Sequence, residues 1–242
     1  MPAAVHCAVN MLVSMFTFMT RAEVLLPMVN GYDDVQWYMS TWTGVTAALE
    51  FIVNPTIGQL SDAYGRKAFL LLAPYANIVL KTLVIARPRI WTLTLERLIC
   101  DGLRTLCGST MGKAMMTDIV PRDELAQSSA ALAVCMGIGL IGAPALSSAL
   151  SPIQTFYGAI VFSVAQLVID TVYLKESLPA EQRKPSWAFT NPFAFTRLFT
   201  QGAQLRKLST VTLLHNMIDI KVTADPMMVF QQVTLGWTRK LR

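Results

Sequence analysis

The sequence predicts an all-α polytopic membrane protein, and three observations support that fold class. Of the 242 residues, 53% are hydrophobic and only 14% are charged, whereas a soluble domain carries about 25% charged residues. The mean hydropathy is +0.46. Apolar segments, each close to the roughly 20 residues that a helix needs to cross a bilayer, follow one another with short polar links between them.

Six of these segments are long enough to be membrane helices, and a polar stretch and a weaker seventh segment follow them. The six cover, in chain order, residues 4–28, 36–60, 68–86, 91–116, 127–150 and 153–174. The polar stretch covers residues 175–207 and contains three prolines. The seventh segment, residues 208–233, is interrupted by Asp219, Lys221, Asp225 and Pro226. We therefore expect an integral, multi-pass membrane protein.

Basic residues in the polar links indicate the orientation of the chain. With the N-terminus in the cytoplasm, the outer links hold only Arg87 and Arg89, as the cytoplasmic bias of Lys and Arg predicts. The cytoplasmic links hold Arg66, Lys67, Arg122, Lys175, Arg183, Lys184, Arg197, Arg206 and Lys207. If the seventh segment crossed, Arg239, Lys240 and Arg242 would lie outside. Either that segment does not cross fully, or a partner or further sequence follows it.

The link between the second and third segments carries a specific pattern, G-x-L-x-D-x-x-G-R-K. Its fixed positions are Gly58, Leu60, Asp62, Gly65, Arg66 and Lys67. Gly65 permits a tight reversal, and Asp62 can cap a helix end or pair with a cation there. The pattern resembles the loop between helices 2 and 3 of the major facilitator superfamily, a large family of secondary transporters.

That resemblance implies a fold of twelve helices built as two related six-helix halves. This chain would supply the six-helix N-terminal half of a major-facilitator fold plus a weak seventh helix. Residues 1–174 would form the six-helix bundle and residues 175–207 the cytoplasmic loop between the halves. Residues 208–242 would form a partial seventh helix and a basic tail.

The fifth segment contains a second motif, from Gly139 through Gly142 and Pro144 to Ser148. It resembles the helix-5 motif of antiporters in this family, with small residues in place of some glycines. A proline here removes a backbone hydrogen bond and can bend the helix. The alternative interpretation is a simple face of small residues that lets two helices pack closely.

The fourth segment is unusually charged for a membrane helix. Arg97, Asp101 and Arg104 are spaced i, i+4, i+7 and share one helix face. A charge near the middle of the bilayer costs about 2.5–3.5 kcal/mol on insertion scales, so this face must meet a cavity or other charges. A path for protons or solute is one interpretation. An internally compensated stripe of ion pairs is the other.

Further ionisable residues in the apolar segments could face the same path. The candidates are Arg21 and Glu23 in the first segment and Glu50 in the second, and Lys81 in the third segment could face it too. Buried carboxylates in a membrane are candidates for proton binding. The tetracycline-efflux-like branch of the family has an acidic residue in its first helix. Alignment on Pro27 puts Phe18 at about that position, so the usual proton site is not reproduced.

Asp118 ends the fourth segment in a stretch that resembles the family's link between helices 4 and 5, D-x-x-P-x-x-E. It could pair with Arg66 as a gate that holds the cytoplasmic side closed. A plain helix-cap role is the alternative.

These features indicate secondary active transport of a small organic solute by alternating access, as proton-coupled antiport similar to that of tetracycline-resistance-type transporters. The expected partners are the lipid bilayer, the solute, protons and, given the length, a second half-chain or homodimer. The alternative is a truncated or half-size protein that acts only through a partner. We expect no enzyme activity, cofactor, metal or nucleic acid, because His6 and His215 are isolated in sequence and no phosphate-binding loop is found.

Overall fold

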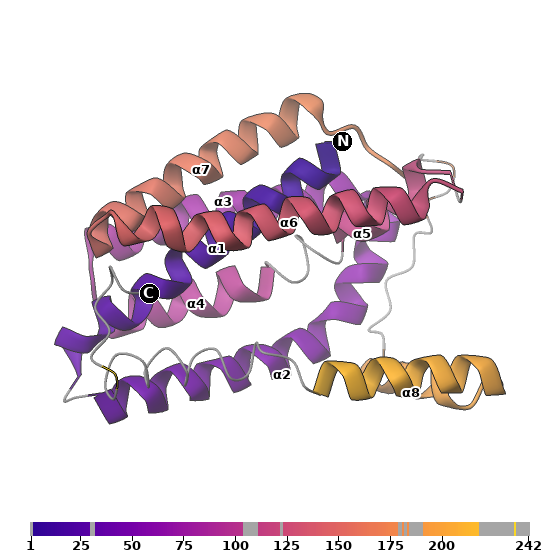
Figure 1. Ribbon diagram of the computed structural model, residues 1–242, viewed down its shortest axis with the longest axis horizontal. Helices are drawn as coiled ribbons and strands as arrows, with labels where there is room; N and C mark the ends of the chain where they lie inside the picture. The colour runs from indigo at the N-terminus through magenta and orange to yellow at the C-terminus, as the bar shows by residue number, and fades with distance from the viewer. Residues whose placement is uncertain are drawn as a thin grey trace.

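The computed structural model describes residues 2–29, 32–103, 111–121, 123–178, 181, 183, 191–217 and 235. These residues form a bundle of long helices, as expected for the all-α fold class (Figure 1). In chain order the helices are α1 (Pro2–Leu25), the 3-10 helix η1 (Leu26–Met28), α2 (Tyr32–Tyr64), α3 (Arg66–Ala86), α4 (Ile90–Leu103), α5 (Met111–Ile119), α6 (Leu125–Ser148), α7 (Pro152–Tyr173), the 3-10 helix η4 (Pro192–Phe199) and α8 (Ala203–Met217).

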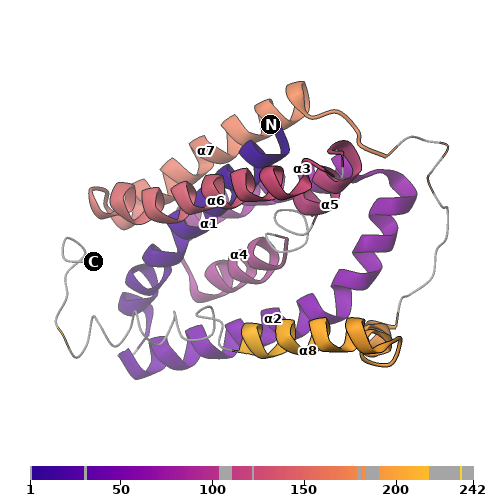
Figure 2. The same cartoon turned by 45° about the vertical axis from the view of Figure 1, so that its right-hand side comes forward.

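Four helices make the main layer of the bundle. α1 packs against α6 and α7, and α7 also packs against α3. α4 lies between this layer and α2 (Figures 1 and 2), while α8 packs against η4, which contacts α2. α2 changes direction along its length, and Pro55 lies inside it. A proline inside a helix is an ordinary cause of such a bend.

Among the described residues, three apolar clusters with several buried members each hold the bundle together. The first joins the end of α1 to α2 and α4 through buried residues such as Leu25, Met39 and Leu93. The second lies in the middle, where Phe16 of α1 contacts Ala143 and Ala159. The third lies at the opposite end from the first, and its buried members are Leu70, Met111, Met115 and Leu174.

The outer faces of α6 and α7 are apolar and exposed. On α7 the exposed residues recur at helical spacing: Val161, Val164, Val168 and Val172. By length and composition, α3, α6 and α7 can each cross a membrane. α1, α2 and α4 carry buried polar and charged residues, and so do α3, with Lys81, and α7, with Asp170. Apolar outer faces around a polar interior are the arrangement expected of a membrane bundle with an internal path.

The helix bounds agree with most of the predicted segments, with two differences. The fourth predicted segment, 91–116, is divided between α4 and α5, and residues 104–110 lie outside the described part of the chain. The seventh begins earlier than predicted, because α8 starts at Ala203. The division into regions at 174 and 207 stays a prediction.

Candidate functional site

Five charged side chains from three helices meet inside the bundle. Arg21 comes from α1, Lys81 from α3, and Glu96, Arg97 and Asp101 from α4. Four of them have side chains no more than 5% exposed, and Asp101 is 17% exposed. We call these five residues the charge cluster. It contains three cations and two carboxylates, so its formal sum is one positive charge.

Arg21 is the centre of the charge cluster. Its Nε and Nη2 atoms donate to the two oxygens of Glu96 over 2.9 Å and 3.0 Å. Its Nη1 atom donates to Asp101 Oδ2 over 2.9 Å. A planar guanidinium suits this geometry, because its donors match the two oxygens of a carboxylate. One arginine therefore ties α1 to α4 at two positions.

Lys81 brings α3 into the charge cluster. Its Nζ atom donates to Glu96 Oε1 over 2.8 Å and to Asn77 Oδ1 over 2.6 Å. Lys81 is 1% exposed and Glu96 is not exposed at all. Glu96 thus balances two cations from two other helices, which offsets the desolvation of all three groups.

Arg97 extends the charge cluster toward α2. It donates to Met39 Sδ and to the Thr43 hydroxyl. Its Nε atom lies 3.9 Å from Asp101 Oδ2, a longer contact than that of Arg21 with the same carboxylate. Asp101 therefore lies between two arginines and is bound more closely by the one on α1.

The structure brings together three of the six residues predicted to line the path: Arg21, Arg97 and Asp101. Glu50 is buried on α2 and Glu23 is half-buried on α1. The interactions described above do not include them, although each has interactions of its own. Arg104 lies outside the described residues. The role of all six in transport stays a prediction.

Lys81, expected from the sequence to be able to face the path, lies in the charge cluster, whereas Glu96 is missing from the predicted set. Glu96 is an ionisable residue inside an apolar segment, so the sequence contains a signal for it. The spacing of charges along the fourth segment places Arg97 and Asp101 on one helix face. It does not include Glu96, the residue before Arg97.

The Gly58–Lys67 motif lies at one end of the bundle, which we call the motif end. Gly65 separates α2 from α3 and has φ +102°, a conformation that favours glycine. Arg66 Nη1 lies 2.9 Å from Asp118 Oδ2, and Arg66 Nη2 lies 3.3 Å from Asp62 Oδ1. The Arg66–Asp118 pair suggested by the sequence is thus present between α3 and α5. Its role as a gate stays a prediction.

Glu176, which was not among the predicted site residues, also holds the motif end. Its oxygens accept hydrogen bonds from the backbone N–H groups of Arg66 and Lys67, over 2.9 Å and 3.1 Å. A carboxylate in this position satisfies the free N–H groups at the start of α3. Partial burial favours a higher pKa for Glu176. The backbone N–H groups of Arg66, Leu178 and Lys67, with the Arg183 charge, outweigh that effect and lower the pKa.

The two glycines of the helix-5 motif, Gly139 and Gly142, have different surroundings. A Cβ atom on Gly139 would lie 2.7 Å from the backbone oxygen of Ala8, so this glycine lets α6 approach α1 closely. A Cβ atom on Gly142 would meet no atom within 4 Å. Pro144 falls within the bounds of α6, and its side chain lies outside the described part. The packing interpretation therefore holds at Gly139, and the antiporter interpretation stays a prediction.

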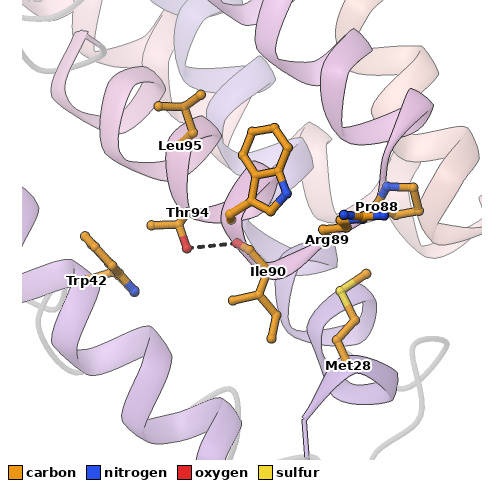
Figure 3. Close-up of a pocket in the computed structure, with 8 residues that line it drawn as sticks. Met28, Trp42, Pro88, Arg89, Ile90, Thr94 and Leu95 are labelled. Atoms are coloured by element: carbon orange, nitrogen blue, oxygen red, sulfur yellow. Dashed lines mark hydrogen bonds between the residues drawn. The ribbon is translucent and has the colours of Figure 1, made fainter.

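A pocket of about 730 Å³ opens at the other end of the bundle (Figure 3). Trp42 of α2 lies across it from Thr94 of α4, and Met28 of η1 closes one side. The lining is mostly apolar, and Arg89 is its charged member. Tyr38 and Thr94 link α2 to α4 beside it through a 2.6 Å hydrogen bond between their hydroxyls. Within the described residues, no three His, Cys, Asp or Glu side chains could hold a metal ion.

Comparison with known protein families and sequences adds to this geometry. A family model described as Major Facilitator Superfamily matches residues 7–240. The tetracycline resistance protein of class C from Escherichia coli is 22% identical over 209 residues, which cover 85% of this chain and 52% of that protein. The class G protein from Vibrio anguillarum is 26% identical over 169 residues, which cover 69% of this chain and 42% of that protein. The chain spans about half the length of the curated relatives it matches.

Among solved structures, the crystal structure of the human organic anion transporter MFSD10 (TETRAN) has a similar fold. The TM-score is 0.79, with 16% sequence identity, over 99% of this chain and 66% of that chain. At this identity the likeness shows the fold alone. The predicted fold class, a six-helix N-terminal half of a major-facilitator fold with a weak seventh helix, is confirmed.

Proposed function

Since the chain belongs to the major facilitator superfamily, we propose that it transports a small organic solute across a membrane by alternating access, in exchange for protons. The family is one of integral, multi-pass transporters and not of enzymes. The observation that carries the proposal is the buried charge cluster formed by α1, α3 and α4. Ionisable residues inside a membrane bundle mark ion and substrate paths.

The two carboxylates of the charge cluster have different roles in this proposal. Glu96 is fully buried and accepts hydrogen bonds from Arg21 and Lys81, so it holds the helices together. Asp101 is the most accessible member and lies between Arg21 and Arg97. Asp101 is therefore the candidate for exchanging protons with the path, and the two arginines hold its charge when the proton leaves. Glu23, Glu50 and Arg104 remain further candidates.

The motif end is proposed as the cytoplasmic gate. The Arg66–Asp118 pair joins α3 to α5, and Glu176 fixes the start of α3. The bias of basic residues toward the same links supports a cytoplasmic N-terminus. Protease added to sealed, right-side-out membranes would then leave residues 175–207 uncut. Cleavage there in sealed membranes would reverse the orientation.

Transport is tested with the full chain in proteoliposomes that carry a pH gradient. Tetracycline is the first probe, because relatives of this chain are tetracycline resistance proteins. We expect accumulation that depends on the gradient, and at least a tenfold loss in Asp101→Asn. Lys207→Gln, an exposed change on α8, is the matched control and should transport like the parent. Equal gradient-driven uptake by parent and Asp101→Asn would refute the assigned role.

The chain spans about half the length of its relatives, and this motivates an alternative function. In that alternative, the chain transports only together with a second half-chain or a second copy of itself. Crosslinking in native membranes tests it. A species larger than the single 26.7 kDa chain, with activity restored on co-reconstitution, would favour this alternative. Gradient-driven flux from the monomeric chain alone would exclude it.

A further inference from the structure

A second pair of buried ionisable residues lies apart from the charge cluster. His6 Nδ1 of α1 is 2.6 Å from Asp170 Oδ2 of α7, and each side chain is 1% exposed. His6, which is isolated in sequence, thus has a buried partner 164 positions away. An ionised carboxylate can only accept, so this contact is a hydrogen bond when the ring proton lies on Nδ1.

Gln166 of α7 completes this site. Its Nε2 atom donates to the backbone oxygen of His6 over 3.4 Å and also lies 3.2 Å from His6 Nδ1. In the described part of the chain, Gln166 Oε1 and Asp170 Oδ1 are buried without a hydrogen-bond partner. Buried polar atoms are nearly always satisfied, so these two acceptors indicate a place that takes up a further donor.

The charge of the pair itself favours proton uptake, whereas the nearest cations oppose it. With a neutral imidazole, the pair would carry one negative charge in an interior where an uncompensated charge is costly. Cys7 of α1 lies near Asp170, and Lys113 of α5 and Cys135 of α6 lie near Cys7. At the end of α7, the Lys67 ammonium of α3 donates to the carbonyl of Thr171, the residue after Asp170.

Buried polar residues on one face of α1 lie between this site and the charge cluster, with the apolar Val13 between Asn10 and Thr17. His6, Asn10, Thr17 and Arg21 recur at spacings that keep them on one face of a helix, and all are at most 4% exposed. They span about 22 Å at a rise of about 1.5 Å per residue. Asn10 Nδ2, between the two sites, has no hydrogen-bond partner among the described residues.

We propose that His6, Asp170 and Gln166 form a proton-binding site at the α1–α7 interface, joined along α1 to the charge cluster at Arg21. The site takes one proton, which converts the pair from a negative to a neutral charge. As a step in proton coupling, this inference rests on the proposed transport function. As a binding site, it can be tested without any transport.

Nitrogen NMR of labelled histidine reads this site directly. The chain has two histidines, so His215→Gln leaves His6 as the only signal. The full chain, with ¹⁵N-labelled histidine and in lipid nanodiscs, is titrated from pH 9 to pH 5. We expect His6 to pass from one to two nitrogen-bound protons in a single step. At pH 6, Asp170→Asn should lower the doubly protonated fraction at least tenfold, and Asp170→Glu should restore it.

Asp123→Asn, an exposed carboxylate change, is the matched control and should leave the His6 signals unchanged. A His6 ring that keeps one protonation state throughout the titration would overturn the proposal. So would an Asp170→Asn protein whose His6 titrates as in the parent. If Asp170→Asn does not fold, the parent titration and Asp170→Glu decide: an Asp170→Glu protein whose His6 takes no second proton down to pH 5 would also overturn it.

Gradient-driven tetracycline uptake separates this inference from the proposed function. If His6 titrates as expected but the parent moves no solute, the proton site stands and the transport proposal fails. If the parent transports but His6 never takes a second proton, the transport proposal stands and this site fails. If both hold, His6→Gln should lose at least tenfold in gradient-driven uptake and retain solute exchange without a gradient.

Discussion

Two parallel hydrogen bonds join Arg21 of α1 to Glu96 of α4, over 2.9 Å and 3.0 Å. The same carboxylate accepts a third bond from Lys81 of α3 over 2.8 Å. One fully buried side chain therefore connects α1, α3 and α4. Its removal would leave two buried cations without their shared partner.

Glu96→Gln is therefore expected to destabilise the protein strongly. Removing one partner of a buried ion pair costs about 3–5 kcal/mol. Chemical unfolding in detergent, followed by circular dichroism, measures the change. Glu124→Gln, an exposed carboxylate change beside α6, should stay within about 0.5 kcal/mol of the parent. A Glu96→Gln protein within about 1 kcal/mol of the parent would show that Glu96 does not balance these cations.

Replacing each of two glycines of α6 with alanine should change the stability of the protein in opposite directions. In Gly139→Ala the new methyl group would lie 2.7 Å from the backbone oxygen of Ala8, and backbone atoms move only if the helices separate. Overpacking of this kind costs about 1–3 kcal/mol. Gly142→Ala meets open space and should gain about 0.5–1 kcal/mol from helix propensity. If unfolding measurements showed both variants to be destabilised, or both to be stabilised, the close approach of α1 and α6 would be contradicted.

Glu176 should make the stability of the motif end depend on pH in the acid range. Its pKa is lowered in the folded protein, so its stabilising contribution is present above the ordinary glutamate pKa, about 4.3. That contribution is lost as the pH falls through the lower, folded pKa. The stability difference between parent and Glu176→Gln should therefore be present at neutral pH and decline with acidification. Thermal unfolding of both proteins across the acid range measures it, and a constant difference would argue against this role.

The Arg66–Asp118 pair is expected to contribute modestly to stability. Its side chains are 13% and 24% exposed, and ion pairs with access to water contribute about 0.2–1 kcal/mol. A double-mutant cycle with Arg66→Gln and Asp118→Asn should return a coupling energy in that range. Coupling indistinguishable from zero would favour the simple helix-cap role for Asp118. Arg206→Gln with Asp118→Asn supplies a distant pair that should show no coupling.

The candidate site was predictable in part, and α4 shows why. Helical spacing placed Arg97 and Asp101 on one face, and the structure keeps both in the charge cluster. Spacing alone could not show that Asp101 is bound more closely by Arg21 of α1, because that depends on how α4 is rotated toward its neighbours. For the same reason Glu96, next to Arg97 in sequence, was passed over.

The sequence by itself determined the membrane class, most helix positions and the turn at Gly65. Each of these depends on local properties: the length of an apolar run, the spacing of charges or the backbone freedom of one residue. Only the tertiary structure decided the partners of the buried charges. Arg21 and Glu96 are 75 positions apart, and His6 and Asp170 are 164 apart. Such pairs form when helices pack at a particular rotation and depth, and that geometry results from all the helix contacts together.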